Sequence, residues 1–459
     1  MRAFLLLLSM IRSKLAVGIL ASLALIYFAW QRPFLERGAN PRNQVISYDV
    51  AGYYAYLPML FIEGDVRLER PWKYDMIQLV GVHEHPETGG RHLKFTSGMA
   101  VLYAPFFAAA HAYTLATHPA EAHGFSLPYR FAIGLAGVLY PLLGLVLLRR
   151  FLRHYVPDAA ITWALVALFL GTNLFYYSSF RGAMSHGATF MLSAAMLYHA
   201  DLWRRREQPG RLVVVGLLAG LVVLIRPVNL LIPVAVAAMF TLDGRLPRGL
   251  LTGRRLALAV AAAALVALPQ LGYWKASTGH WFVWTYGREG FFWTEPAWIQ
   301  GLFSWRKGWF LYTPMAAFMI FGFWGFARKK PAWALIVGLY LVTTAYMTFS
   351  WWAWWYGGSF GARPLIDAYA LLALPLAVYF QRMLEEAPAV LRRLSLATAT
   401  GLVALNLLQT YYYTAGYLHH DSMTRAAYLH VMRHADFAPR ELLEAPDYDA
   451  ALKGAEPRY

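Results

Sequence analysis

The sequence predicts an all-α polytopic membrane protein with roughly 11–13 transmembrane helices, because apolar runs of span length recur along it. The 459 residues are 59% hydrophobic and only 14% charged. Soluble domains average about 45–50% apolar and about 25% charged residues. Short basic clusters separate the apolar runs, as expected for cytoplasmic loops. We treat 1–459 as a single integral-membrane domain.

The first predicted span covers Lys14 to Trp30 and has no small-residue cleavage site after it. It is therefore interpreted as a retained helix with its basic end inside, not as a signal peptide. Further apolar runs lie near Gly98–Ala116, Tyr129–Leu148, Ile161–Tyr177, Ala188–Leu202, Leu212–Ile225, Leu230–Leu242, Leu256–Leu271, Phe310–Phe326, Trp333–Phe349, Leu365–Phe380 and Leu394–Tyr413. Because Arg226-Pro227 interrupts the run at Leu212–Leu242, we expect a hairpin or a broken helix there.

The first outer loop, 31–97, is the longest polar stretch. Asp49–Leu57 is amphipathic and rich in tyrosine, which is typical of a helix lying in the membrane interface. Val80–Lys94 contains Pro86 and Gly89-Gly90 and predicts a turn or hairpin. A second long outer loop is expected at 273–309, and an outer C-terminal tail at 414–459.

Positive charge predicts the orientation of the spans. Basic clusters occur at Arg149-Arg150-Arg153, Arg204–Arg206, Arg245/Arg248/Arg254/Arg255, Arg328–Lys330 and Arg382/Arg392/Arg393. Placing them inside leaves Tyr176–His186, Arg226–Asn229, Tyr273–Trp309 and Trp351–Arg363 outside. The alternation fails upstream, where a crossing at Gly98–Ala116 would put Arg149 outside. Either Gly98–Ala116 does not cross fully, or one loop breaks the charge rule.

Composition and motifs also exclude several functions. The net charge of +16 lies in scattered clusters and forms no continuous basic domain, so no nucleic-acid partner is predicted. The absence of cysteine excludes disulfides, thiolate metal sites and a cysteine nucleophile. No nucleotide-binding glycine motif occurs. His83-Glu84-His85 alternates in a loop and only superficially resembles a metal pair, so no metal site is predicted; the metal requirement is left open.

Asp49 is the candidate catalytic residue. It follows the first span among several tyrosines, where a poorly hydrated setting would raise its pKa and let it accept a proton from an acceptor hydroxyl. The alternative is a structural helix N-cap, a position that aspartate fills well.

The candidate substrate-binding residues are basic side chains at the outer ends of the spans. Arginine, lysine and histidine suit phosphate contacts, whereas the alternative for most of them is snorkelling at the interface. The set is Arg181, His186, Arg226, Arg288, Arg306, Lys307 and Arg363. Arg226 stands out because it interrupts apolar sequence on both sides. Arg363 lies in a tryptophan- and glycine-rich stretch, Ser350–Asp367, whose tryptophans are also explained by an interfacial belt.

Four stretches together resemble a known family. They are SYDVAGYYAYLP, LLAGLVVLIRPVNLLIP, FSWRKGWFLYTP and WWAWWYGGSFGARPLID. The chain is similar to the integral-membrane C-type glycosyltransferases, the superfamily of protein O-mannosyltransferases and lipid A aminoarabinose transferases, and within it to an uncharacterised bacterial subset. Two positions depart from the pattern: Val50 follows the first-loop aspartate where many relatives have a second acid, and Ser185-His186 replaces an outer-turn aspartate.

The resemblance implies a polyprenyl-phosphate sugar donor, an inverting transfer, Asp49 as base, and Arg226, Arg306 and Arg363 as donor-phosphate ligands. It implies action at the outer face of the cytoplasmic (inner) membrane, with a glycan, lipid or protein acceptor. No cofactor beyond the lipid-linked donor is expected. The two departures put a second catalytic carboxylate and a metal requirement in doubt.

Two rival functions are a transporter or flippase for a lipid-linked saccharide, and an O-antigen ligase or polymerase that uses a diphosphate-linked donor. A transporter predicts polar residues deep within several spans and often an inverted repeat. The predicted spans are instead largely Leu, Ala, Val and Gly, with polar groups at the loop edges.

Overall fold

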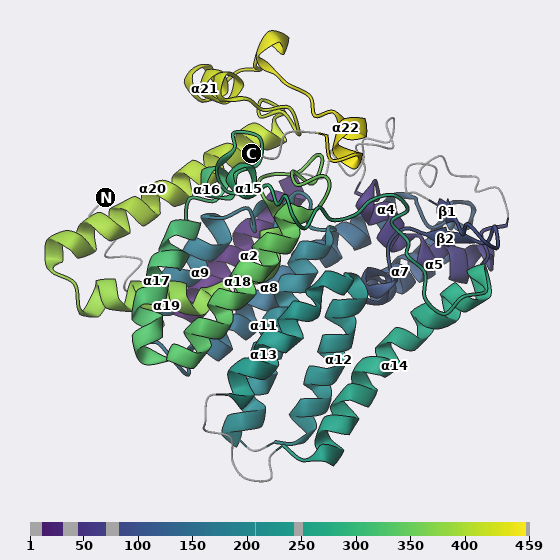
Figure 1. Ribbon diagram of the computed structural model, residues 1–459, viewed down its shortest axis with the longest axis horizontal. Coiled ribbons are helices and arrows are strands. Elements are labelled where there is room, and N and C mark those ends of the chain that lie inside the picture. Colours follow the sequence, from purple (N-terminus) through teal and green to yellow (C-terminus); the bar gives the residue numbers. More distant parts are fainter. Residues whose placement is uncertain (1–11, 31–44, 70–81, 207, 243–250, 456–459) are drawn as a thin grey trace.

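The computed structural model describes residues 12–30, 45–69, 82–206, 208–242 and 251–455, and Figure 1 shows a bundle of helices with one small hairpin at its side. The N-terminal elements are α2 (Ser13–Trp30), α4 (Asp49–Tyr54), α5 (Tyr56–Pro58), the π-helix η2 (Met59–Glu63), β1 (Val82–Glu84), β2 (Arg91–Leu93), α7 (Gly98–Thr117), η3 (Pro119–Glu121), α8 (Leu127–Leu152), α9 (Asp158–Leu170) and α10 (Tyr176–Ser179). The middle elements are α11 (Ser185–Arg206), α12 (Gly210–Ile225), η4 (Pro227–Leu230), α13 (Leu231–Thr241), α14 (Gly253–Thr278), α15 (Trp298–Phe303), α16 (Trp309–Tyr312), α17 (Ala316–Lys329) and α18 (Pro331–Ser350). The C-terminal elements are η5 (Arg363–Ala368), α19 (Tyr369–Glu385), α20 (Ala389–Thr414), α21 (Arg425–His434), η6 (Arg440–Leu442) and α22 (Tyr448–Leu452).

Six helical segments are long and apolar enough to cross a membrane: α2, α7, α8, α14, α18 and the continuous segment Arg363–Glu385. Three shorter apolar helical segments, Asp158–Leu170, Gly210–Ile225 and Pro227–Thr241, accompany them. The helical class is confirmed and is compatible with a multi-pass membrane protein. Because only these six segments meet both criteria within the described ranges, the count of roughly 11–13 spans stays a prediction.

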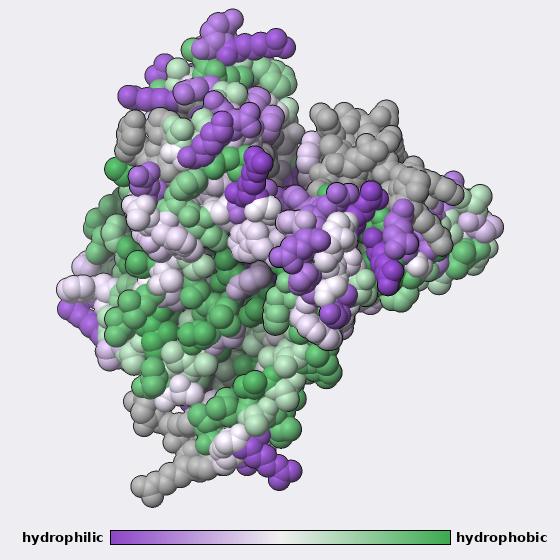
Figure 2. Space-filling view, turned by 45° about the vertical axis from the view of Figure 1, so that its right-hand side comes forward, coloured by the Kyte–Doolittle hydropathy of each residue, from purple (hydrophilic) through white to green (hydrophobic). Residues whose placement is uncertain are grey.

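The outer surface of the bundle carries the apolar side chains that a lipid contact needs. Figure 2 shows hydrophobic side chains over the middle and lower part of one face, with hydrophilic ones gathered towards its top. On α14 and α18 the exposed apolar residues are Leu256, Leu258, Val260, Leu265, Leu268, Leu335, Leu339 and Val342. A soluble protein rarely exposes so continuous an apolar surface.

Small residues let two of these helices approach closely. On α12, a Cβ atom at Gly216 would lie 2.2 Å from the carbonyl oxygen of Ala259 on α14, and one at Gly220 would lie 2.5 Å from that of Ala263. This small-xxx-small packing is typical of helices that associate within a membrane. Because the two glycines contact Ala259 and Ala263 in the same order along the chain, α12 and α14 run in parallel.

The basic clusters in the described part of the chain meet at one end of the bundle, here called the basic end, whereas Arg245 and Arg248 lie outside the described residues. Nε of Arg149 donates to Oγ of Ser13 at 2.7 Å, which places the end of α8 beside the start of α2. The guanidinium of Arg204 and the ammonium of Lys330 both lie over the ring of Trp333. The sequence prediction that these clusters share a side is therefore consistent with the packing of the helices.

The contacts of α7 bear on the conflict in the charge pattern. Gly98 packs against the backbone of Ile225 at the end of α12, and Gly124, in the segment between α7 and α8, packs on Pro58 of α5. The hydroxyl of Tyr54 on α4 donates to the carbonyl oxygen of Gly124. The start of α7 thus lies beside Ile225, at the end of the bundle away from Ser13, here called the loop end. Because α7 is also long and apolar enough to cross a membrane, both alternatives for Gly98–Ala116 stay predictions.

Two further predictions concern the loop end. The interruption at Arg226-Pro227 proves to be a hairpin, in which α12 arrives from the basic end and α13 returns to it, where Phe240 packs on Trp333. β1 and β2 form the predicted hairpin, with His83 opposite His92. The helix at Asp49–Leu57 exists as α4 and α5, but its tyrosines are buried within the protein and do not line a membrane interface.

In the C-terminal tail, α21 and α22 lie together at the top of the molecule in Figure 1. The ring of Tyr448 on α22 packs against Trp352 and Trp355. The predicted tail and the Ser350–Asp367 stretch therefore share a face of the molecule, and that face also carries the cavity described next.

Candidate functional site

A cavity of about 220 Å³ opens at the loop end, between the first outer loop, the α12–α13 hairpin, α18 and the tryptophan-rich stretch. Its lining comes from six separate parts of the chain. The lining residues are Asp49, Lys94, Phe95, Arg226, Pro227, Val228, Asn229, Leu231, Ile232, Trp284, Tyr286, Glu289, Phe291, Tyr340, Thr344, Met347, Thr348, Trp351, Tyr356, Arg363, Pro364 and Asp367.

Asp49 and Arg363 form an ion pair in this cavity. Asp49 is the first residue of α4, and Tyr48 occupies the N-cap position, so the structure does not show the N-cap role for Asp49. Nη2 of Arg363 donates to Oδ2 of Asp49 at 3.0 Å. The Asp49 side chain keeps 27% of its surface exposed and the Arg363 side chain 15%, which makes the pair largely buried yet reachable from the cavity.

The electrostatic setting of Asp49 differs from the sequence prediction. Burial acts to raise the pKa of Asp49, as expected, but Arg363, Arg226 and Lys94 outweigh burial and hold the pKa below its ordinary value. The expectation of a raised pKa is therefore wrong for the free protein. The cause lies in Arg363, 314 residues away in the sequence, whose position beside Asp49 depends on the fold.

Arg226 occupies the break between α12 and η4, in an extended conformation that the following Pro227 favours. The break points its side chain into the cavity rather than along a helix. Nη2 of Arg226 donates to the hydroxyl of Tyr53 at 3.3 Å, and Nη1 lies 3.9 Å from Oδ2 of Asp367. His186 contacts the same carboxylate, because its Nδ1 lies 3.0 Å from Oδ1 of Asp367.

A third ion pair joins Lys94, just after β2, to Glu289 in the second long loop. The ammonium of Lys94 also lies 5.5 Å from the ring centre of Tyr286. These contacts join residues of the two long loops, 31–97 and 273–309, at the cavity.

The charges that line the cavity balance. In the described part of the chain, the three cations Lys94, Arg226 and Arg363 face the three carboxylates Glu289, Asp367 and Asp49. An anionic ligand must therefore compete with a carboxylate for its cation. Nε of Arg363 has no hydrogen-bond partner among the described residues, so this guanidinium retains an unused donor.

The uncharged lining of the cavity contains two kinds of side chain. Val228, Leu231, Ile232 and Met347, on or next to α13 and α18, form an aliphatic part, here called the aliphatic wall. Aromatic rings form a second part, here called the aromatic wall, in which Trp351 packs edge-on against Tyr286 and Phe291. Charged groups, an aliphatic wall and an aromatic wall thus meet in one space, which suits an amphiphilic ligand.

Of the eight predicted site residues, Asp49, Arg226 and Arg363 line the cavity, and His186 contacts it through Asp367. The others lie outside the lining. Arg181 reaches Ser47 at 3.5 Å, and Arg288 is exposed to solvent. Nη2 of Arg306 donates to the carbonyl oxygen of Glu444 at 3.3 Å.

Lys307 is buried away from the cavity lining. Its ammonium donates to the carbonyl oxygens of Ser359 and His420, so it ties the tryptophan-rich stretch to the C-terminal tail. Burial lowers the pKa of Lys307 to about 7. These contacts give Lys307 a structural position in the fold.

Sequence reasoning missed Asp367, Lys94, Glu289 and Tyr53. Asp367 could have been found, because it follows Arg363 by four residues at the start of an apolar run, a spacing that places two side chains on one helical face. Lys94 and Glu289 carried no such local signal, since each finds its partner about two hundred residues away.

Comparison with known proteins adds no identification: no protein-family model matches the chain, and no curated protein is significantly similar to it.

Proposed function

We propose that this protein is a membrane glycosyltransferase of the C-type superfamily, which moves a sugar from a polyprenyl-phosphate carrier to an acceptor hydroxyl. The observation that carries the proposal is the Asp49–Arg363 ion pair in a cavity with one aliphatic and one aromatic wall. The acceptor is a hydroxyl of a glycan, a lipid or a protein.

The aliphatic wall of Val228, Leu231, Ile232 and Met347 suits the first isoprene units of the carrier. The aromatic wall that includes Trp351 and Tyr286 suits the face of a sugar ring. Arg363 and Arg226, which also line the cavity, are the proposed contacts for the phosphate that joins lipid to sugar.

In the reaction, the bond between the sugar C1 and the phosphate oxygen breaks, and a bond between the acceptor oxygen and C1 forms. The acceptor proton passes to the carboxylate of Asp49, which acts as general base. The electron pair of the broken bond stays on the polyprenyl phosphate, whose growing negative charge Arg363 and Arg226 stabilise.

The Asp49–Arg363 ion pair gives a way in which donor binding could increase the basicity of Asp49. In the free protein Arg363 keeps Asp49 ionised and weakly basic. A donor phosphate that takes Arg363 away would leave the buried carboxylate without its nearest cation. Burial then raises the pKa of Asp49 and strengthens it as a base only when donor is present.

The arrangement of the helices supports a proposed location. The basic end faces the cytoplasm by the positive-inside rule, so the cavity opens at the outer face of the cytoplasmic (inner) membrane. The apolar surfaces of α14 and α18 contact membrane lipid, from which a polyprenyl carrier enters the cavity between α13 and α18.

The test is transfer of radiolabelled sugar by the full-length protein in liposomes, using a panel of polyprenyl-phosphate sugars. Asp49→Asn should lower the rate by roughly 10²–10⁴-fold, the usual contribution of a general base. Asp436→Asn, a change at an exposed aspartate outside the cavity, is the matched control and should keep the wild-type rate. Full activity in Asp49→Asn would refute the assigned base.

The same assay separates the rival functions. Transfer from diphosphate-linked but not monophosphate-linked donors would favour a ligase or polymerase. Movement of a lipid-linked saccharide across the bilayer without transfer, unaffected by Asp49→Asn, would favour a flippase.

A further inference from the structure

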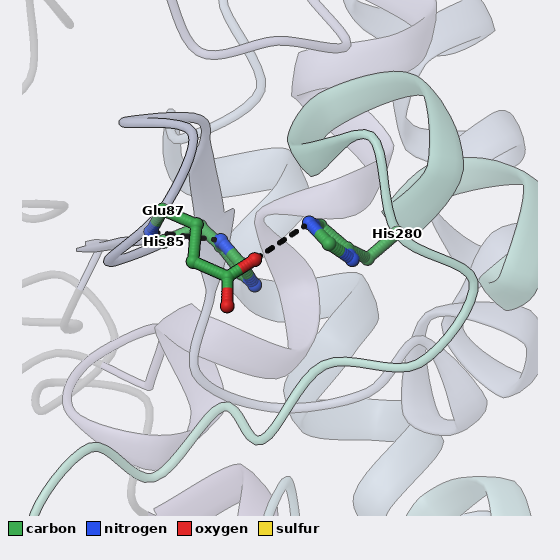
Figure 3. Close-up of side chains that lie close together, drawn as sticks. All are labelled: His85, Glu87 and His280. Carbon is green, nitrogen blue, oxygen red and sulfur yellow. Dashed lines mark hydrogen bonds and ion pairs between the residues drawn. The ribbon is translucent and has the colours of Figure 1, made fainter.

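A second cluster of polar side chains lies at the edge of the loop end, outside the cavity lining. His85 and Glu87, at the tip of the β1–β2 hairpin, face His280, just beyond the end of α14 (Figure 3). One ligand atom from each residue lies within 4.8 Å of the other two. Oε2 of Glu87 is 3.5 Å from Nε2 of His280. The imidazoles of His85 and His280 stack with ring centres 4.4 Å apart.

Contacts that do not involve the side chains of His85, Glu87 or His280 hold the β1–β2 hairpin against α14. Oγ1 of Thr88 donates to the carbonyl oxygen of Thr278 at 2.9 Å. At Gly90 a Cβ atom would lie 2.2 Å from the carbonyl oxygen of Ser277, so only glycine permits this approach of the hairpin to α14. The three side chains are thus brought together by docked backbone segments, which is the preorganisation that a metal site needs.

The donor atoms suit a transition metal. Two imidazoles and one carboxylate form a ligand set typical of Zn²⁺ sites with an open fourth position. Ligands about 2.0–2.1 Å from a tetrahedral metal lie about 3.4 Å from one another, close to the Glu87–His280 distance.

We propose that His85, Glu87 and His280 bind a divalent transition metal of the Zn²⁺ type, with water in the fourth position. The metal would fasten the β1–β2 hairpin to the second long loop. The hairpin leads directly to Lys94, and the loop beyond His280 leads to Tyr286, so both segments that the metal joins continue into the cavity wall. This site does not depend on the proposed sugar transfer.

A second candidate cluster, His419, His420 and Asp421, is less suited to a metal. Its members are consecutive in one turn, and Nδ1 of His419 already accepts from the backbone N–H groups of Asp421 and Ser422. The ammonium of Lys307 donates to the carbonyl oxygen of His420 and adds positive charge nearby. We therefore use this cluster as the internal control.

The experiment measures Zn²⁺ bound to the full-length, detergent-solubilised protein, prepared without a polyhistidine tag, dialysed against ZnCl₂ and analysed by mass spectrometry of the metal. His280→Ala and Glu87→Gln should each remove one equivalent of zinc, while His420→Ala should remove none. Removing a residue that hydrogen-bonds to a metal ligand typically weakens metal binding by about 10–100-fold. Removing the ligand itself should weaken metal binding at least as much.

Thermal unfolding gives an independent measurement. Zn²⁺ should raise the Tm of the wild type and of His420→Ala, because a ligand that binds only the folded state stabilises it, and should not raise that of His280→Ala. Glu87 is 75% exposed, so Glu87→Gln folds normally even if His280→Ala does not. Zinc binding that is absent from the wild type, unchanged in Glu87→Gln, or lost only in His420→Ala would overturn the proposal.

Discussion

Two aspartates at opposite ends of the bundle, Asp49 and Asp201, are both paired with arginine but differ in what else surrounds them. At the basic end, Asp201 is fully buried and accepts from Nδ1 of His154 at 2.5 Å, from the hydroxyl of Tyr155, and from Nε of Arg205 at 2.8 Å. At the loop end, the described partner of Asp49 within hydrogen-bond distance is Arg363, and the carboxylate lines a cavity.

The difference teaches how to separate a structural carboxylate from a functional one. Three hydrogen-bond donors contact Asp201, and none of the residues that line the cavity is near Asp201 in the sequence. We therefore interpret the network around Asp201 as one that stabilises the basic end. Asp49 retains acceptor capacity and access, and its partner Arg363 retains an unused donor. Residue type and burial alone would not have separated the two.

The largest effect is expected from removing the cation at the loop end. Arg363→Ala should weaken binding of farnesyl phosphate, a short polyprenyl-phosphate probe, by about 10–100-fold, since hydrogen bonds to charged groups contribute about 1.5–3 kcal/mol. Arg288→Ala, at an exposed arginine on the same face, is the matched control and should change the affinity less than twofold. Equal losses in both variants would mean that the face attracts anions without a specific site.

The substitution Asp201→Asn tests the structural role of the network at the basic end. It should lower the free energy of unfolding by about 1–3 kcal/mol, because a buried network loses its charged acceptor while Arg205 can turn to solvent. Chemical denaturation in detergent measures this change. Farnesyl phosphate affinity at the opposite end should stay at the wild-type value, and a parallel loss of affinity would contradict a purely structural role.

A further effect, on pH dependence, is expected from Lys307. Burial lowers its pKa from 10.5 to about 7, so between these values the unfolded chain holds a proton that the folded protein has released. Stability should therefore rise with pH across this window, by at most about 1.4 kcal/mol per pH unit. In Lys307→Met this part of the slope should disappear from unfolding curves recorded between pH 6 and 9. An unchanged slope would show that Lys307 stays protonated in the fold.

Much of the fold was predictable because hydropathy and charge are local signals. The apolar runs became helices, the break at Arg226-Pro227 became a hairpin, and the described basic clusters lie near one end. The contact of Gly98 with the end of α12 was not predictable, because length and composition give α7 the character of a span and say nothing of its neighbours.

The site was predictable only in part. Asp49, Arg226 and Arg363 could be found because each is a charge at the edge of an apolar run. Their pairing could not, because Arg363 reaches Asp49 across the whole molecule. The same tertiary pairing reversed the expected direction of the Asp49 pKa.

The most direct test of the central claim is the affinity of farnesyl phosphate for Asp49→Asn. If the phosphate and Asp49 compete for Arg363, removing the carboxylate should tighten binding by about tenfold, as expected when a charge-assisted hydrogen bond no longer has to be broken. Affinity for farnesol, which has no phosphate, should not change. Isothermal titration calorimetry in detergent measures both. Unchanged or weaker binding of farnesyl phosphate by Asp49→Asn would contradict the account.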